Sequence, residues 1–507
     1  MSRLSRRDFL KLASALPGAL ALARLLPNRS WPASGQAPSR PNILIFVFDA
    51  MSARNLSVYG YPRKTTPNIE RFAQRATVYN AHSSAGSFTV PGTASLLTGL
   101  YPWTHRAIND AGLIARNLLD RNIFRLVGEQ YHRLAFAQNL WPVYFFDQFQ
   151  KDIDEILPAG SFSQLDFVFG ERFKNDPLNA QRVLDDFFFS QGTAPKSLVF
   201  SLAERISLHR AVAHTNQGGY PNGLPQNHQY PLYFRLPAVF DGLMSTVESL
   251  GSASLAYFHL YPPHDPYNPS KKYFRTFDDG WSPVDKPMHP LGDHWSHKDL
   301  YRFRRAYDEY LATLDEEFGR MLDFLESHGV FETSYVVVTS DHGELFERGE
   351  RGHVSPLLYE AGIRVPLIIS SPGQKSRQDV NSPTSSVDVA PTLAHLAGNP
   401  LPDWREGELL PLLGGQELPE RSIFTLYALK NPAFAKLSRI SLAMRKGSYK
   451  MLFYRGYYHS GDKFELYDLQ NDPEELHDLY STGSAIAKSL QEEVLAKLEA
   501  VNAPYKS

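Results

Sequence analysis

The stretch that most constrains the fold is Asn42–Phe48 (NILIFVF), an apolar run that is followed at once by Asp49. Such a run predicts a strand that is buried on both faces, as in a sheet covered by helices on both sides. Ligands of open α/β sheets gather beyond the carboxyl ends of the strands. The chain is therefore expected to form an α/β fold with a polar site that begins at Asp49.

The rest of the chain continues this alternation of strands and helices, which predicts a doubly wound sheet. Further strands are predicted at 134–137, 254–260, 335–340 and 365–369. Helices are predicted at 66–76, 117–130, 180–190, 237–250, 300–328 and 387–397. After about residue 417 come short alternating strands at 439–444, 449–453 and 463–467, and a final helix at 484–502. This last part is typical of a smaller α+β unit.

Three segments are therefore expected. Residues 1–40 form a signal and linker, residues 41–416 a catalytic domain, and residues 417–507 a C-terminal α+β subdomain. Within the second segment, residues 141–250 are aromatic and loop-rich, and we interpret them as a variable insertion that shapes substrate access.

Composition excludes several classes of protein. Hydrophobic residues make up 43% and charged residues 21% of 507 residues, which is typical of a globular chain and not of a disordered or membrane-embedded one. The net charge of −2 provides no basic field for nucleic acid. The chain has no cysteine, so disulfides, thiolate metal sites and a cysteine nucleophile are excluded.

The N-terminus carries the pattern SRRDFLK at residues 5–11, followed by an apolar run at 12–23. That run is shorter than the roughly 20 residues that span a bilayer, but it fits the core of a secretory signal. Arg6 and Arg7 resemble the pair of a twin-arginine signal, which would make the twin-arginine export machinery a partner and place the protein in the periplasm or outside the cell. A Sec signal or an uncleaved anchor is the alternative.

Residues 87–99 (SFTVPGTASLLTG) predict a helix with a hydroxyl near its start. Thr89 stands two positions before Pro91, which suits a first helical turn, and Gly99 is placed to end the helix. Free N–H groups at such a helix start can hold an anionic ester beside the hydroxyl. An ordinary capped helix is the alternative interpretation.

Asp49 and Asp341 each follow a predicted buried strand, and His342 adjoins the second. Two carboxylates and an imidazole make a divalent cation site, which a threonine hydroxyl can complete. Taken separately, each acid fits a turn or a helix cap equally well.

Several motifs together resemble the sulfatase family of the alkaline phosphatase superfamily. They are PNIL followed by Asp49, TPNI at 66–69, the helix at 89–99, TSDHGE at 339–344, YEAGIRVPL at 359–367, DVAPTL at 388–393, KGSYK at 446–450, and ELYDL with DPEE at 465–475. The resemblance implies a sandwich with a large central mixed β-sheet flanked by helices, plus a small C-terminal α+β domain.

The departures from the family pattern bear on the reaction. Sulfatases carry a cysteine or serine, converted to formylglycine, where this chain has Thr89, and an arginine where it has Thr93. Ala50 stands in place of a second metal-binding acid, and His342 in place of a frequent asparagine. This pattern resembles the threonine-nucleophile branches, such as lipoteichoic acid synthases and phosphodiesterases, and implies an enzyme without formylglycine.

Carried over, the resemblance implies one divalent metal ion bound by Asp49, Thr89, Asp341 and His342. One imidazole among oxygen ligands favours zinc or manganese, and calcium, which is usual in sulfatases, stays open.

By the same resemblance, His264 and His353 match positions that contact the transferred group in relatives. There they would stabilise its oxygens or help the leaving group depart. The alternative interpretation is two histidines in surface loops. A second metal on this pair is not expected, since no accompanying acid is evident, and His259 is expected to face the sheet core or edge.

The leading hypothesis is an exported, metal-dependent hydrolase or transferase of phosphate monoesters, diesters or phosphonates that works through a covalent Thr89 intermediate. A small molecule or an envelope glycan or lipid ester is the expected substrate. The alternatives are a sulfuric ester hydrolase without formylglycine, and a non-catalytic binding protein on the same fold.

Overall fold

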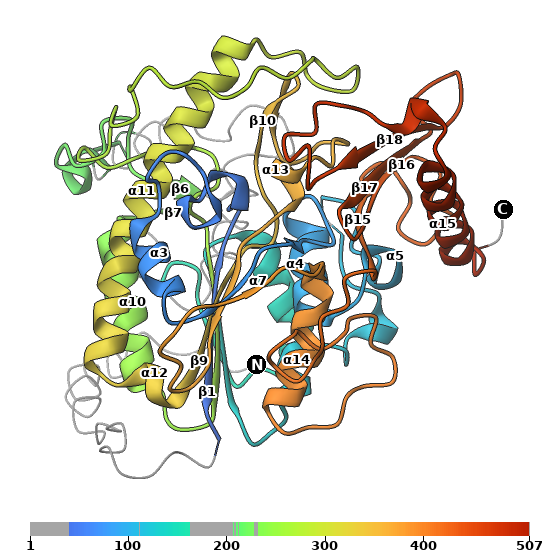
Figure 1. The fold of residues 1–507 in the computed structure, drawn as a ribbon. Helices are drawn as coiled ribbons and strands as arrows, with labels where there is room; N and C mark the ends of the chain where they lie inside the picture. Colours follow the sequence, from blue (N-terminus) through green and yellow to red (C-terminus); the bar gives the residue numbers. More distant parts are fainter. Residues whose placement is uncertain are drawn as a thin grey trace, which may run out of the picture.

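The computed structural model describes residues 40–110, 112–162, 206, 209–210, 212–227 and 232–505. Within these residues, eight strands form a central mixed sheet in the order β13-β2-β12-β9-β1-β8-β4-β5 (Figure 1). The neighbours β9, β1, β8, β4 and β5 are all parallel, whereas β12 runs antiparallel to both β9 and β2. The predicted mixed central sheet is confirmed.

The strands of the central sheet are β1 (Asn42–Phe48), β2 (Thr77–Tyr79), β4 (His132–Ala137), β5 (Glu155–Leu157), β8 (Ser254–Leu260), β9 (Ser334–Thr339), β12 (Leu367–Ser370) and β13 (Gln378–Val380). Three two-stranded ribbons pair β10 (Leu345–Glu347) with β11 (Glu350–Gly352), β14 (Thr384–Ser385) with β3 (His82–Ser83), and β6 (Gln226–Asn227) with β7 (Leu232–Tyr233).

The α-helices are α3 (Pro67–Ala73), α4 (Thr89–Thr98), α5 (Pro102–His105), α6 (Ile123–Val127), α7 (Leu140–Gln148), α10 (Leu236–Ser249), α11 (His297–Ser327), α12 (Val330–Thr333), α13 (Glu360–Ile363), α14 (Val389–Leu396) and α15 (Ala485–Asn502). Short 3₁₀ turns are η2 (Ala53–Asn55), η3 (Ser57–Tyr59), η4 (Arg116–Leu118), η6 (Ser386–Asp388) and η7 (Tyr480–Thr482).

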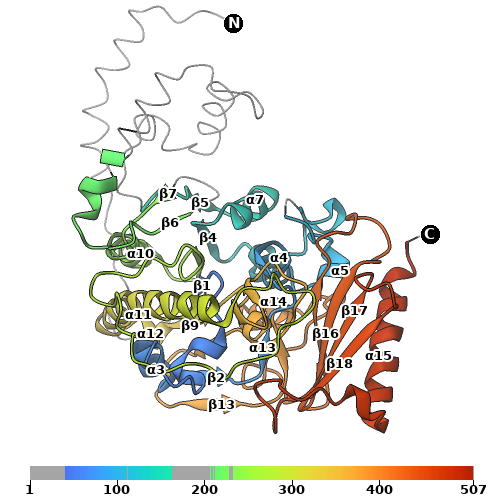
Figure 2. The same ribbon diagram turned by 90° about the horizontal axis from the view of Figure 1, so that it is seen from above.

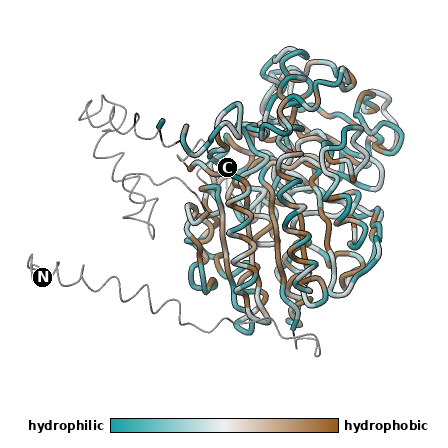
Figure 3. The backbone as a smooth tube through the Cα atoms, turned by 90° about the vertical axis from the view of Figure 1, so that its left-hand side faces the viewer, coloured by the Kyte–Doolittle hydropathy of each residue, from teal (hydrophilic) through white to brown (hydrophobic). Residues whose placement is uncertain are grey.

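Helices cover both faces of the central sheet. In Figure 1, α3, α10, α11 and α12 lie on one side of β1 and β9, and α4, α7 and α14 lie on the other. All seven residues of β1 are buried, as its apolar sequence predicts. Figure 3 shows hydrophobic stretches concentrated in the inner elements and hydrophilic ones in the outer loops. The core thus sits between the sheet and its two helical layers.

The C-terminal part forms a second, antiparallel sheet of β15 (Ser422–Tyr427), β16 (Ile440–Lys446), β17 (Tyr449–Arg455) and β18 (Lys463–Asp468). This sheet lies between α15 and the rest of the molecule (Figure 2). Leu426 N donates to Ala85 O at 2.9 Å, so β15 supports the segment that leads into α4.

Most predicted elements appear within a few residues of their expected bounds, but residues 117–130 differ. In place of one helix, η4 ends near Leu118 and α6 begins anew at Ile123. The cause is Asn122, which has extended backbone and caps α6 by accepting a hydrogen bond from Arg125 N at 2.9 Å.

Within the predicted insertion 141–250, β5 extends the central sheet and α10 packs on α11. The helix predicted at 180–190 and the signal segment before residue 40 lie outside the described residues. Among the described helices, none combines the length and the apolar character that a membrane crossing needs.

Candidate active site

Four parallel neighbours in the central sheet, β9, β1, β8 and β4, carry polar side chains to one edge. Asp341 lies two residues beyond β9, Asp49 directly follows β1, His259 is the penultimate residue of β8, and Asn139 lies two residues beyond β4. Because parallel strands end at the same edge, residues from four distant segments meet there.

The turn after β1 sets the direction of Asp49. Ala50 has a φ of 63°, a left-handed conformation that is uncommon for a residue with a Cβ. Its N–H donates to Asp341 Oδ1 at 3.3 Å, and its carbonyl accepts a hydrogen bond from Tyr307 Oη at 2.7 Å. These contacts hold a strained turn in place, as is common at functional sites.

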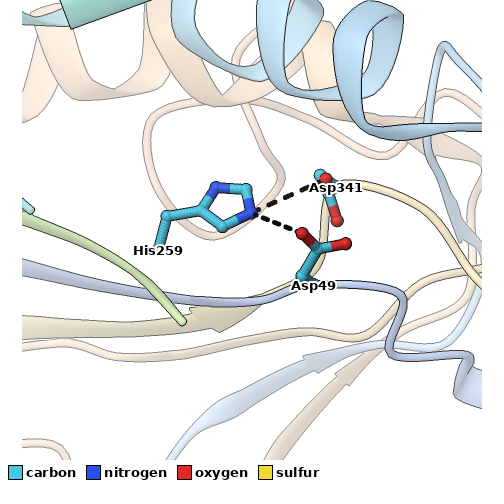
Figure 4. Close-up of side chains that lie close together, drawn as sticks. All are labelled: Asp49, His259 and Asp341. Carbon is cyan, nitrogen blue, oxygen red and sulfur yellow. Dashed lines mark ion pairs between the residues drawn. The ribbon is translucent and has the colours of Figure 1, made fainter. Parts of the chain in front are cut away.

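Asp49, His259 and Asp341 form a buried cluster (Figure 4). His259 Nε2 lies 3.5 Å from Asp49 Oδ2 and 3.7 Å from Asp341 Oδ2, and all three side chains are fully buried. One ligand atom from each residue lies within 4.8 Å of the others. His259 was expected to face the sheet core or edge. It lies buried at that edge, where the end of β8 directs its side chain between the two acids.

Neighbouring side chains fix the orientation of these groups. Asn139 Nδ2 donates to Asp49 Oδ2, and Thr93 Oγ1 donates to Asp341 Oδ2 at 3.2 Å. The hydroxyl of Tyr257 lies 3.2 Å from His259 Nδ1, which leaves the Nε2 atom of His259 directed at the carboxylates. Such supporting hydrogen bonds are typical of metal-binding residues.

His342 joins the cluster from the other side. Its Nδ1–H donates to Gly343 O at 2.9 Å, so its Nε2 atom is directed at the acids. That Nε2 atom lies 3.3 Å from Asp49 Oδ1, 3.6 Å from Asp341 Oδ2 and 3.2 Å from Thr89 Oγ1. His342 therefore connects the acids to the threonine hydroxyl.

Helix α4 brings Thr89 to the site as its first residue, and Thr89 is only 4% exposed. The close approach depends on Gly92, where a Cβ would lie 2.2 Å from the carbonyl oxygen of Asp341. Only a residue without a side chain fits this contact. The glycine in the helix thus sets the distance between Thr89 and the acids.

Burial and charge together determine the protonation of the cluster. Burial lowers the pKa of His342, but Asp341 and Asp49 outweigh it and raise the pKa to about 9. Burial opposes ionisation of Asp49, yet His264, His259 and His342 hold its pKa well below the usual range. Burial and the charge of Asp49 raise the pKa of Asp341. Two neighbouring carboxylates in a buried site are stabilised by a positive charge beside them.

His264 and His353 lie beside this cluster, where the resemblance predicts contacts to the transferred group. The ring centroid of His353 lies 4.3 Å from that of His342 and 4.7 Å from that of His264. His264 Nδ1–H donates to Asp265 O at 2.7 Å. His353 Nδ1 lies 3.2 Å from Glu344 Oε2, and Glu344 is buried, with a pKa that burial raises to about 7.

The residues of the cluster fit a divalent cation. Asp49 Oδ1 and His259 Nε2 are buried, and neither has a hydrogen-bond partner within the described part of the chain. Polar atoms are rarely buried without a hydrogen-bond partner, so the convergence of these two atoms fits a site for a divalent cation. Carboxylate oxygens with imidazole nitrogens are ligands that suit zinc or manganese.

The structure thus gathers all six residues that the sequence singled out: Asp49, Thr89, His264, Asp341, His342 and His353. Sequence reasoning missed His259, Glu344 and Asn139. A histidine near the end of a buried apolar strand was the available signal for His259. Glu344 is an acid beside His353, which the sequence analysis did not recognise.

The fold and the site define an α/β protein with a buried cluster of acids and histidines that could hold a divalent cation. The chain belongs to the sulfatase family: residues 41–166 and 212–399 match the family described as Sulfatase. Residues 349–503 match the family described as N-sulphoglucosamine sulphohydrolase, C-terminal. The protein is a hydrolase of this family, whose members use a divalent metal.

Individual relatives agree with this assignment. Choline-sulfatase of Rhizobium meliloti (strain 1021) is 32% identical over 472 residues, covering 87% of this chain and 82% of that protein. Arylsulfatase A of Homo sapiens is 25% identical, with coverages of 88% and 85%. The crystal structure of phosphonate monoester hydrolase of Agrobacterium radiobacter superposes with a TM-score of 0.64 at 18% identity, covering 92% of this chain and 96% of that one. At this identity, the last similarity shows the fold alone.

Proposed function

We propose that the protein is a metal-dependent hydrolase or transferase of phosphate monoesters, phosphate diesters or phosphonates that works through a covalent Thr89 intermediate. The observation that supports it is the position of Thr89 Oγ1, 3.2 Å from His342 Nε2 at the N-terminus of α4. The hydroxyl therefore adjoins both the acidic cluster and the free N–H groups of the first helical turn.

The residues proposed to hold the metal are Asp49, Asp341, His342, Thr89 and, in addition, His259. Zinc or manganese is favoured by the mixture of nitrogen and oxygen ligands, with calcium as a further choice. The cation would lower the pKa of the Thr89 hydroxyl and attract the negative charge of the ester.

In the proposed reaction, Thr89 Oγ1 attacks phosphorus while the bond to the leaving oxygen breaks. The hydroxyl proton passes to water, and the leaving oxygen takes a proton from the imidazolium of His264 or His353. Water then attacks the phosphorus of the phosphothreonine and gives one proton to the imidazole, while the bond to Thr89 Oγ1 breaks and that oxygen takes back a proton from solvent. The product is phosphate from a monoester, a phosphate monoester from a diester, or a phosphonate. Glu344 orients His353 for this role through the contact at Nδ1.

Phosphorus is preferred over sulfur as the reacting centre on chemical grounds. The chain contains no cysteine, and Thr89 offers no precursor of the formylglycine aldehyde, because a secondary alcohol oxidises to a ketone. A sulfate group on a plain alcohol is cleaved slowly by water, whereas phosphothreonine next to a cation can turn over. Sulfate ester hydrolysis is the second candidate, and the names of the relatives, choline-sulfatase and arylsulfatase A, favour it.

We propose export as well, because the SRRDFLK pattern at residues 5–11 resembles a twin-arginine signal. The substrate would then be met in the periplasm or outside the cell, as a small molecule or an ester of an envelope glycan or lipid. Replacing Arg6 and Arg7 by lysine should retain the protein in the cytoplasm, as measured by cell fractionation; unchanged export would contradict the proposal.

The reaction is tested by assaying aryl phosphate, phosphodiester, phosphonate and sulfate esters with the wild-type chain, Thr89→Ala and Thr89→Ser. Thr89→Ala should lose activity by at least about 1,000-fold, whereas Thr89→Ser retains a hydroxyl and should keep part of it. Mass spectrometry of the quenched reaction should find phosphate on Thr89. Unchanged turnover in Thr89→Ala would refute the nucleophile, and preference for sulfate would support the second candidate.

Metal analysis of the purified chain addresses the non-catalytic alternative. About one equivalent of a divalent ion is expected per chain, because one buried cluster of acids and histidines is available among the described residues. A chain that holds no divalent ion and turns over no ester would instead be a binding protein.

A further inference from the structure

One hairpin joins Glu344 to His353. Glu344 directly precedes β10 and His353 directly follows β11, and the last pair of the hairpin is Glu347 with Glu350. At the other end of the hairpin, His353 Nδ1 lies 3.2 Å from Glu344 Oε2. The place of the His353 imidazole beside the acidic cluster therefore depends on how this hairpin is held.

The turn of the hairpin carries an unusual residue. Arg348 and Gly349 have φ of 56° and 79°, so both central residues of this two-residue turn are left-handed. Such turns favour asparagine, aspartate or glycine at the first position, because a larger side chain is strained there. Arg348 is nevertheless buried, with 5% of its surface exposed. An arginine at this position indicates that its contacts offset the strain.

The contacts of Arg348 lead to the C-terminal subdomain. Its guanidinium donates to Glu475 O and lies 4.0 Å from the ring centroid of Tyr359. Its carbonyl accepts a hydrogen bond from His289 N at 2.9 Å, and His289 Nε2 lies 3.1 Å from Glu465 Oε1 of β18. The turn of the hairpin is thus held from two sides by residues of the second sheet and of the segment that follows it.

Glu475 also holds helix α13, which lies beside the second sheet (Figures 1 and 2). Glu475 is buried and has a φ of 56°, a second strained position. Its Oε2 atom accepts a hydrogen bond from the N–H of Glu360, the first residue of α13, at 2.9 Å. Its Oε1 atom lies 2.7 Å from Lys450 Nζ of β17. One residue therefore ties α13, β17 and the hairpin turn together.

Helix α13 carries this support to the start of the hairpin. The carbonyl of Gly362 accepts a hydrogen bond from Gly343 N at 2.9 Å, and that of Ala361 accepts one from Glu344 N at 3.0 Å. A Cβ at Gly343 would lie 2.2 Å from Ala361 O, so the two segments are in close contact. Strand β10 is thus fixed at its start through α13 and at its end through Arg348.

We propose that Arg348 and Glu475 are positioning residues for His353: through the hairpin, the C-terminal subdomain holds this imidazole where it protonates the leaving oxygen. The inference rests on the proposed function, in which His264 and His353 are the alternative proton donors. Because Nδ1 of His353 contacts Glu344, the transferred proton is the one on Nε2. The leaving oxygen takes this proton as its bond to phosphorus breaks.

Esters with different leaving groups separate a positioning role from a merely structural one. Phenyl phosphate and 4-nitrophenyl phosphate are assayed with the full wild-type chain and with Arg348→Met. The corresponding sulfates are assayed beside them, so the comparison applies to whichever ester the chain prefers. A nitrophenolate, with a conjugate-acid pKa of about 7, leaves without a proton, whereas a phenolate, at about 10, needs one.

The expected result is a loss that depends on the leaving group. Arg348→Met should lower kcat/KM for the phenyl ester about 30-fold or more, and that for the nitrophenyl ester less than about threefold. The KM values should change little, since no contact to the substrate is removed. Equal losses on both esters would show a general distortion of the site and overturn the proposal.

Amide hydrogen exchange provides a measurement that needs no turnover. In Arg348→Met, residues 343–353 should exchange about tenfold faster, while β1 and β9 keep their wild-type rates. Unchanged exchange of the hairpin overturns the proposal even where the proposed reaction is confirmed. If none of the esters is turned over, the proposed function is refuted, and exchange still decides whether Arg348 holds the hairpin.

Further variants locate the effect. Arg348→Lys keeps a cation and should limit the loss on the phenyl ester to about fivefold. Should Arg348→Met fail to fold, Glu475→Gly replaces it, because glycine suits the φ of 56° while the carboxylate bound to Glu360 N is lost. Its phenyl-to-nitrophenyl ratio of kcat/KM should fall about threefold or more. An unchanged ratio in that variant overturns the proposal.

Lys446→Met is the matched control. It removes an ion pair of 2.8 Å with Glu493, which joins β16 to α15 inside the same subdomain. The ratio of kcat/KM for the two esters should stay at its wild-type value. A fall as large as that in Arg348→Met would mean that any weakening of the subdomain has the same effect, and it would overturn the assignment to Arg348 and Glu475.

Discussion

Gly92→Ala tests whether the distance between helix α4 and the acidic cluster controls the reaction. A Cβ at this position would lie 2.2 Å from Asp341 O, 3.0 Å from Asp341 C and 3.2 Å from Ser84 Oγ. The first of these contacts is with backbone, which cannot rotate away as a side chain does. Either α4 or the turn that carries Asp341 must therefore move.

The size of the effect follows from this geometry. Relieving the contact of 2.2 Å with Asp341 O requires a shift of roughly 1 Å. A misplacement of about 1 Å near reacting groups typically costs about 100-fold in rate. Overpacking costs about 1–3 kcal/mol of stability, and the higher helix propensity of alanine returns up to about 1 kcal/mol. We therefore expect kcat/KM to fall about 100-fold and the free energy of unfolding by only about 1–2 kcal/mol.

The assay measures kcat/KM on the best ester together with urea unfolding. Gly160→Ala serves as the matched control, because a Cβ there meets its nearest atom, Leu232 Cδ1, at 3.9 Å; it should retain wild-type activity. Wild-type kcat/KM in folded Gly92→Ala would refute the reasoning, since the position of Thr89 relative to Asp341 would then not limit the rate.

Three further predictions follow from buried charges. His259→Ala should weaken divalent-metal binding at least about 10–100-fold, as measured by competition with a chromophoric chelator; an unchanged affinity would remove His259 from the site. Lys450→Met removes the ammonium that lies 3.1 Å from Glu360 and 2.7 Å from Glu475, which leaves Glu360 only its weaker ion pair with Arg445 at 3.8 Å. The change should cost about 3–5 kcal/mol in urea unfolding. A loss below about 1 kcal/mol would contradict it. Burial opposes the ionisation of Glu347, but Lys286 and neighbouring arginines lower its pKa from 4.5 to about 2. The ionised carboxylate therefore contributes roughly 3 kcal/mol to the free energy of unfolding above pH 4.5, and this contribution is lost as the pH falls toward 2. The stability difference between wild type and Glu347→Gln should therefore shrink below pH 4.5, and a difference independent of pH would refute it.

Much of the fold could be predicted because local pattern and burial agree in the central strands. The apolar runs that became β1 and β8 were recognised with their observed bounds. The break within residues 117–130 was harder to predict, because the helical spacing of apolar residues continues across Asn122. In the structure the side chain of Asn122 caps the N-terminus of α6, so a new helix begins there.

The site was predictable where a chemical residue follows a strand directly. Asp49 directly follows β1, and Asp341 and His342 come two and three residues after β9. Their arrangement needed only the rule that parallel strands end at one edge. His259 was not predictable in this way, because its role depends on the register of β8 beside β1, which pairs it with Val47, two residues before Asp49. Register between strands that are more than 200 residues apart in the chain leaves no mark in the sequence of either one.

The sequence by itself determined the α/β class, the hydroxyl at the start of α4 and the absence of any thiol chemistry, because these depend on residue type and local spacing. Tertiary structure alone decided the position of His259 between Asp49 and Asp341 and the contact of Glu344 with His353. Those features arise where loops from different strands converge. The packing of the whole chain determines which distant side chains come into contact at the site. Those contacts in turn determine the protonation of the side chains and the ligands that they can bind.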